Sequence, residues 1–404
     1  MHVVTSRLIA AALGTAIVLV GPTSHAQDQS ETQAVVAQEP PPSNDGFVAR
    51  LRRFADDAQI IERINGDIDG WYPRLGGITR GSGLALGPGY RFRLFDQRVF
   101  VDVSAALSTR GYRSAEAEVR WLQAFGERLE LWTDLRYEDH PQEDFFGTGY
   151  ASSRATRTSY DFEKLEITVR GVARPTSWLR TGASVGYMSP RIGPGSDDNY
   201  PSTEELFTDA DAPGLAAQPD FVHTTFFGEI DYLDQRGRPR RGGLHRISFG
   251  VWDDRTLQQF DHRRFDALSA HYLPLTADKR HVVSGRLGLS YVNNETGERV
   301  PFYFLAYVGG VDTIRGYREF RFKDENALWL GAEYTWSVLD YLSVATFFDA
   351  GEVRADWNDI GLHGLRTASG FGVRFHTDRQ TFARVDVGTG GNEGWQVFFK
   401  IGPR

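Results

Sequence analysis

Residues 129–137 read LELWTDLRY, and the alternation in this stretch indicates an all-β fold. As a strand, it places Leu, Leu, Thr, Leu and Tyr on one face and Glu, Trp, Asp and Arg on the other. The same period of two recurs at 165–170 and at 395–401. An apolar face backed by a charged face suits a lipid-facing wall around a wet lumen. A soluble β-sandwich would turn its charges toward bulk water instead, and the sequence alone leaves that alternative open.

Composition favours the membrane barrel. Aromatic residues make up 13% of the chain, glycine occurs 43 times, and the segment after the N-terminal region has no apolar run long enough for a membrane helix. A barrel strand alternates and therefore looks polar on average, so the lack of a long apolar run is compatible with a membrane barrel. The net charge of -8 argues against nucleic acid as a partner.

The N-terminus reads as an export signal spanning residues 1–26. Arg7 provides a positive charge, residues 8–20 are an apolar run, and Ala26 ends a small-residue cleavage pattern. That run is shorter than the roughly 20 residues that cross a bilayer. The chain has no cysteine, which excludes disulfides and acylation on cysteine.

Residues 27–75 are predicted to be periplasmic. Their first part, to Ser43, is rich in Gln, Glu and Pro and is expected to be disordered. Apolar residues then recur at helical spacing from Phe47 to Ile64, which indicates a short amphipathic helix. This helix could lie against the periplasmic rim or plug the lumen.

Residues 76–404 are predicted to form an all-β, 16-stranded antiparallel transmembrane barrel. The expected strands are 77–86, 89–95, 98–108, 113–125, 128–138, 157–173, 178–189, 221–234, 244–253, 263–273, 281–292, 325–336, 341–351, 365–377, 381–388 and 394–402. The long connections follow strands five, seven, eleven and thirteen, which are all odd. Long loops at one rim and short turns at the other are typical of outer-membrane barrels, whose strand number is even.

Three motifs in the last quarter of the chain point to one site. Residues 308–317 read VGGVDTIRGY, residues 331–333 read GAE, and residues 347–351 read FFDAG. Alternation puts Glu333 and Asp349 on the same, lumen-facing side of adjacent strands. A guanidinium can bridge two carboxylates through charge-assisted hydrogen bonds, so the three motifs favour a clamp; the alternative is a solvated loop arginine beside ordinary lumen charges.

These motifs, in this order, resemble the signature of the BamA/TamA superfamily, the bacterial surface antigen family of outer-membrane assembly and translocation barrels. The resemblance implies that Arg315 reaches Glu333 and Asp349 and holds the loop between strands eleven and twelve inside the lumen. It also implies a seam between the first and last strands that opens laterally. The residues assigned to the clamp are Arg315, Gly316, Tyr317, Glu333, Phe347, Asp349 and Gly351.

The resemblance places the protein in the outer membrane of a Gram-negative bacterium. The expected partners are outer-membrane lipids, lipopolysaccharide, and client polypeptides or a separate periplasmic protein. Family members that assemble other barrels carry periplasmic POTRA repeats, and residues 27–75 are too few for one repeat, so we expect a member lacking them. The alternative is a passive channel for small solutes.

No motif indicates an enzyme, a metal site or a cofactor. The ten histidines lack metal-binding spacing, and neither a phosphate-binding glycine loop nor a serine-hydrolase elbow is present. Six carboxylates between Arg191 and Asp220 could bind divalent cations near lipopolysaccharide, but a solvated acidic loop explains them as well.

Overall fold

The computed structural model describes residues 68–124, 126, 128–294, 298–377 and 380–401. The chain divides into two units, Met1–Ile68 and Asp69–Arg404, and nearly all described residues belong to the second. The predicted signal peptide, the disordered segment and the amphipathic helix lie outside the described residues.

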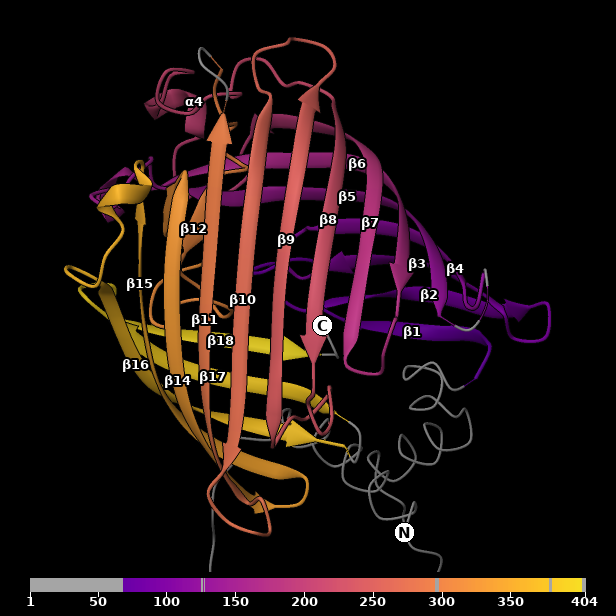
Figure 1. Cartoon of the computed structure of the whole chain (residues 1–404). Coiled ribbons are helices and arrows are strands. Elements are labelled where there is room, and N and C mark those ends of the chain that lie inside the picture. The colour runs from indigo at the N-terminus through magenta and orange to yellow at the C-terminus, as the bar shows by residue number, and fades with distance from the viewer. Residues whose placement is uncertain (1–67, 125, 127, 295–297, 378–379, 402–404) are drawn as a thin grey trace, which may run out of the picture. The chain divides into compact units, whose positions relative to one another are not determined.

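The second unit is an antiparallel sheet of sixteen strands curled into a barrel (Figure 1). Its strands are β1 (Gly70–Gly76), β2 (Ala85–Leu94), β3 (Val99–Ser108), β4 (Arg113–Trp121), β5 (Leu129–Phe145), β6 (Thr158–Ala173), β7 (Leu179–Pro194), β8 (Phe221–Asp231), β9 (Gly242–Asp254), β10 (His262–Pro274), β11 (His281–Asn294), β14 (Asn326–Leu339), β15 (Leu342–Arg354), β16 (Arg366–His376), β17 (Thr381–Gly390) and β18 (Trp395–Ile401). The predicted fold class, strand number and antiparallel order are confirmed.

The predicted position of the first strand is wrong. β1 spans Gly70–Gly76, so the barrel begins at Gly70 and not at Gly76, and residues 77–84 connect β1 to β2. β1 is short, bounded by glycines and interrupted by Pro73, which hides its alternation. Proline is tolerated there because β1 is an edge strand with one hydrogen-bonded neighbour.

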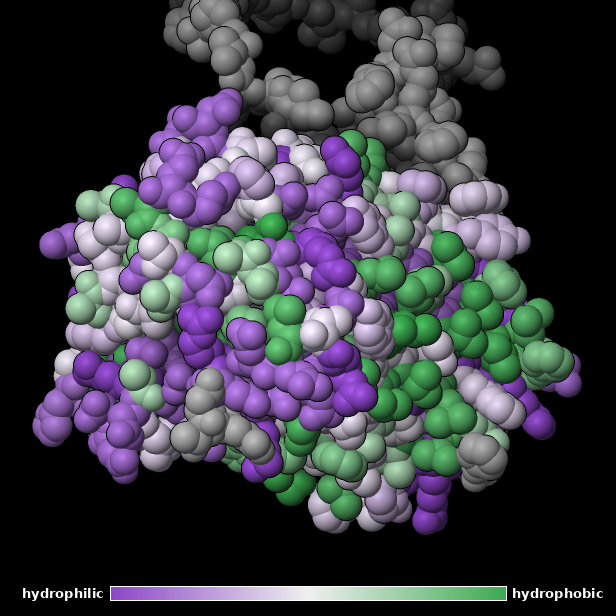
Figure 2. Space-filling view, turned by 90° about the horizontal axis from the view of Figure 1, so that it is seen from above, coloured by the Kyte–Doolittle hydropathy of each residue, from purple (hydrophilic) through white to green (hydrophobic). Residues whose placement is uncertain are grey.

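The long connections lie at one end of the barrel. They follow β5, β7, β11 and β15, which are the fifth, seventh, eleventh and thirteenth strands of the sheet. Three of them hold short helical turns: η1 (Arg154–Thr156), α4 (Thr203–Leu206) and η2 (Trp357–Asp359). This end is at the top of Figure 1, and seen from above its middle is covered by hydrophilic residues (Figure 2).

The outer face of the wall is apolar. Large hydrophobic side chains with about half of their surface exposed recur at every second residue on strands around the barrel. Examples are Leu135, Leu165, Ile167, Val185, Leu287, Phe371 and Val397. Charged residues of the same strands take the intervening, inward positions. None of the described helices has the length and apolar character needed to cross a membrane.

Buried apolar residues gather inside the barrel at the end with the long connections. The connection between β11 and β14 supplies much of this core, and β5 and β6 supply part of the wall behind it. Phe302 contacts Phe145 and Tyr160 edge to face, with ring centroids 5.0 and 4.9 Å apart. Burial of these aromatic side chains therefore fixes the connection against the wall.

Candidate functional site

The connection between β11 and β14 folds back into the lumen. Its two ends form a small antiparallel hairpin, β12 (Ala306–Val308) with β13 (Phe322–Asp324). The tip that this hairpin carries, residues 309–321, lies against the inner face of β14 to β17. We call residues 298–325 the lumen loop.

Arg315 is the buried centre of this tip, with 1% of its surface exposed. Its Nε donates to Asp349 Oδ2 at 2.8 Å and its Nη2 to Asp349 Oδ1 at 3.0 Å, which is a bidentate ion pair. Its Nη1 donates to Glu333 Oε2, and its backbone N–H donates to Asp349 Oδ2 at 3.0 Å. The guanidinium also stacks over the ring of Phe347, 3.7 Å from the centroid. The structure thus brings Arg315 together with three other residues named from the sequence.

Two glycines allow the tip to lie so close to the wall. A Cβ on Gly316 would stand 2.7 Å from the Cβ of Ala368 and from the backbone carbon of Thr389, and the φ of Gly316 is 149°. A Cβ on Gly351 would stand 2.6 Å from the carbonyl oxygen of Leu328 and 3.0 Å from Ile314. Both positions therefore require glycine.

Tyr317 completes the tip and is 3% exposed. Its ring meets Phe322 edge to face at 5.4 Å. It also lies over Gly390 of β17, where a Cβ would approach the ring to 2.4 Å. The side chain is therefore held between the hairpin and the wall.

Further charges extend the cluster across β16 and β17, and sequence reasoning missed them. Arg374 donates to Glu333 at 3.1 Å and pairs with Asp386 at 2.7 Å, and Arg384 pairs with Asp386 at 3.2 Å. Arg286 of β11 lies 3.6 Å from Asp349. The alternation of the sequence places Arg374 and Asp386 on the inward faces of their strands, but no motif links these two residues to the loop. Cations and carboxylates alternate here, so no carboxylate of the cluster stands alone.

A second set of ion pairs ties the lumen loop to both sides of the barrel's closure. Asp312 pairs with Arg80, in the β1–β2 connection, at 2.8 Å and with Lys400 of β18 at 3.6 Å. Arg80 also donates to the hydroxyl of Tyr307. Burial alone would raise the pKa of Asp312, but the neighbouring cations lower it to about 2. The carboxylate is therefore charged at neutral pH and holds both partners.

The first and last strands, β1 and β18, form no ladder among the described residues. They approach each other at Gly76, where a Cβ would lie 3.1 Å from the carbonyl oxygen of Ile401. We call this boundary the seam. Among the same residues, no group of three or more His, Asp or Glu is placed to hold a metal ion.

Fold and site together define a transmembrane β-barrel whose lumen holds an inserted loop fixed by a buried arginine. The family model described as the Omp85 superfamily domain matches residues 101–390, and the chain belongs to this superfamily. This confirms the resemblance inferred from the three motifs.

Solved structures of similar fold agree with this assignment. BamA from Haemophilus ducreyi lacking POTRA domains 1–3 has a TM-score of 0.62 at 14% identity, covering 82% of this chain and 69% of that one. CdiB from Escherichia coli has a TM-score of 0.52 at 13% identity, with coverages of 89% and 72%. CdiB from Acinetobacter baumannii has a TM-score of 0.50 at 12% identity, with coverages of 82% and 58%. At these identities the likeness is one of fold.

Proposed function

We propose that the protein is an outer-membrane barrel that assembles or translocates polypeptides by opening the seam. The observation that carries this proposal is the missing β1–β18 ladder, because every other pair of neighbouring barrel strands in the described chain is hydrogen-bonded. An unpaired strand edge presents N–H and C=O groups to which a client strand can add.

The lumen contains a cavity that can hold a short segment of a client polypeptide. A cavity of about 350 Å³ opens at the short-turn end, between the β8–β9 turn and the Arg315 cluster. Its walls include Arg374, Arg384 and Lys400, with Glu333 as the one carboxylate of its lining. Lys400 belongs to the seam strand β18, so the cavity reaches the seam from inside. This arrangement supports delivery of a segment from the periplasm to the seam.

A passive channel fits the site less well. The lumen loop and its buried ion pairs occupy the interior between the cavity and the end that carries α4. Arg315 itself is 1% exposed, so the loop tip excludes water from the lumen side of β14 to β17 around this residue. We therefore expect the wild-type protein to show little steady conductance in a planar bilayer, whereas Arg315→Ala should open it.

A reversible cross-link tests the seam directly. The chain has no cysteine, so a Leu75→Cys, Ile401→Cys pair introduces the two thiols alone. Both side chains face outward beside the seam, with exposures of 38% and 42%. In proteoliposomes, oxidation of this pair should abolish insertion of an unfolded barrel client, and reduction should restore it.

The matched control is a Leu287→Cys, Leu330→Cys pair. These residues are direct partners in the β11–β14 ladder, which does not need to open. Oxidation there should leave client insertion unchanged. Full activity of the seam-locked protein, or a steady wild-type current without any client insertion, would refute the proposal.

A further inference from the structure

A cavity of about 700 Å³ lies on the outer face of the wall, where β10, β11 and β14 meet the connection after β15. Its apolar side consists of Phe265, Leu289, Tyr291 and Trp357. The residues of β11 that share a face with Tyr291 include the exposed Leu287, whereas the intervening residues point inward. The cavity, which we call the wall groove, therefore faces away from the lumen.

The wall groove lies at the membrane interface. At one end of β11, His281 stacks on Trp336, with centroids 5.9 Å apart; at the other end, Tyr291 meets Trp357 edge to face at 6.1 Å. About ten residues at ~3.3 Å each, tilted by ~40°, separate these two aromatic levels by about 25 Å. That is the height of the apolar band between the aromatic girdles of a membrane barrel. The occupant that meets this groove is consequently a lipid.

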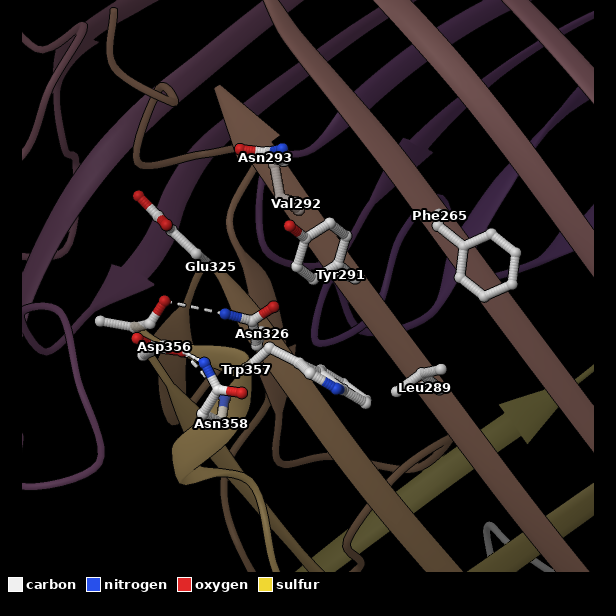
Figure 3. A pocket seen from close by; sticks show the side chains of 11 residues that line it. Phe265, Leu289, Tyr291, Val292, Asn293, Glu325, Asn326, Asp356, Trp357 and Asn358 are labelled. Atoms are coloured by element: carbon white, nitrogen blue, oxygen red, sulfur yellow. Dashed lines mark hydrogen bonds between the residues drawn. The ribbon is translucent and has the colours of Figure 1, made fainter. Parts of the chain in front are cut away.

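The opposite side of the groove is polar and carries the acceptor oxygens of Glu325, Asn326 and Asp356 (Figure 3). Asn326 is 1% exposed, and its Nδ2 donates to the backbone carbonyls of Arg354 and Ala355 at 3.1 and 2.8 Å. Those two bonds fix the amide orientation and leave its buried Oδ1 without a hydrogen-bond partner. A buried acceptor in this state costs free energy until a donor reaches it.

Two carboxylates, Glu325 and Asp356, stand on the same side of the groove. Asp356 accepts from Asn358, and neither carboxylate forms an ion pair within the part of the chain that the structure describes. The lining contains no lysine or arginine. A headgroup with a bare phosphate at this spot would meet two carboxylates and no cation of the lining.

We propose that the wall groove binds a membrane lipid whose headgroup carries a primary ammonium group. The ammonium lies against Asn326 and Glu325, and an acyl chain runs along Phe265, Leu289 and Trp357. An ammonium provides three donors for a set of acceptors, and a cation is attracted to aromatic faces as well. A volume of about 700 Å³ suits a headgroup with the upper part of one chain. The proposal rests on the barrel crossing a membrane and not on its transport activity.

Native mass spectrometry of the full chain in detergent tests the headgroup. Three phospholipids with identical acyl chains are compared, with ethanolamine, choline and glycerol headgroups. We expect the ethanolamine lipid to be retained about tenfold more than the glycerol lipid, as one charge-assisted hydrogen bond provides. The choline lipid should fall between them, since it keeps the charge but has no N–H. Equal retention of the ethanolamine and glycerol lipids would overturn the proposal.

Variants locate the binding. Glu325→Gln removes one charge from a side chain that no described hydrogen bond or ion pair holds, so the barrel should fold normally, and the ethanolamine preference should fall about fivefold. Asp359→Asn is the control, because it also removes one carboxylate charge and Asp359 lies in η2 beside the groove residue Trp357, but Asp359 does not line the groove. Trp357→Ala should weaken retention of all three lipids together. An unchanged preference in Glu325→Gln, or an equal loss in Asp359→Asn, would place the lipid elsewhere and refute the assignment.

Discussion

Replacing Arg315 by alanine should release the lumen loop from the barrel wall. The substitution removes a side chain that is 1% exposed and makes three charged hydrogen bonds, two of them to Asp349. Breaking a buried pair by removing one partner costs about 3–5 kcal/mol. Here Glu333 keeps Arg374 at 3.1 Å, and Asp349 keeps Arg286 at 3.6 Å, so we expect the lower value of about 3 kcal/mol. That corresponds to roughly a 150-fold larger population with the loop detached.

Limited proteolysis of the folded barrel measures this population. Cleavage between residues 298 and 325 should become much faster in Arg315→Ala, and the urea midpoint of unfolding should fall. Arg318→Ala is the matched control, because Arg318 lies in the same loop but its side chain is 36% exposed and makes only a long ion pair, at 3.6 Å, with Asp144. If both variants resist protease as well as wild type, the ion pairs do not hold the loop. Asp349→Ala in the Arg315→Ala background should add little further loss, since the two residues act as one unit.

Four other substitutions probe the loop. Gly316→Ala should detach the lumen loop as Arg315→Ala does, because the new Cβ would overlap the Cβ of Ala368. Limited proteolysis of the loop checks this expectation. A loop that stays protected would show that residue 316 does not require glycine. Burial raises the pKa of Glu319 to about 7 from an ordinary 4.5, so the stability that it contributes is present below pH 4.5 and is lost as pH rises through 7. Urea midpoints measured across that range should fall in wild type and fall less in Glu319→Gln; parallel curves would refute this. Burial lowers the pKa of Lys323 to about 8, and four aromatic rings lie within about 6 Å of its Nζ, so Lys323→Met should unfold at an equal or higher urea concentration. Asp312→Asn should speed thiol cross-linking of the seam pair by any long linker, and an unchanged rate would show that Asp312 does not restrain the closure.

Much of the wall could be predicted because period-two alternation is local. Leu165 and Leu287 show their outward direction through their immediate neighbours. Counting the alternating runs predicted sixteen strands, and the parity of the connections agreed with that number. The position of β1 was not predicted, because the strand has only seven residues and Pro73 and the glycines at its two ends interrupt the alternation of apolar and polar residues. A short edge strand carries too few alternating positions to be recognised by period alone.

Only the site residues that belong to the linked motifs could be predicted from the sequence. Arg315, Glu333 and Asp349 were named from linked motifs, whereas Arg374 and Asp386 were inward charges without a motif to connect them. Their meeting depends on the curvature that brings β14, β16 and β17 around one loop tip, and curvature is not encoded in any local period. The wall groove was missed for a similar reason, since Trp357 folds back from a loop onto strands that are distant in sequence.

Pro73 stands directly opposite Pro88 in the β1–β2 register. Neither residue has an N–H, so the two cannot exchange hydrogen bonds, and the backbone groups of Pro73 must point toward the free edge of β1. Along that edge, positions 71 and 75 present donors while position 73 presents a carbonyl alone. Any strand that docks there, whether β18 or a client, finds an incomplete partner. A strand added to this edge therefore forms one backbone hydrogen bond fewer than it would beside an edge strand without proline.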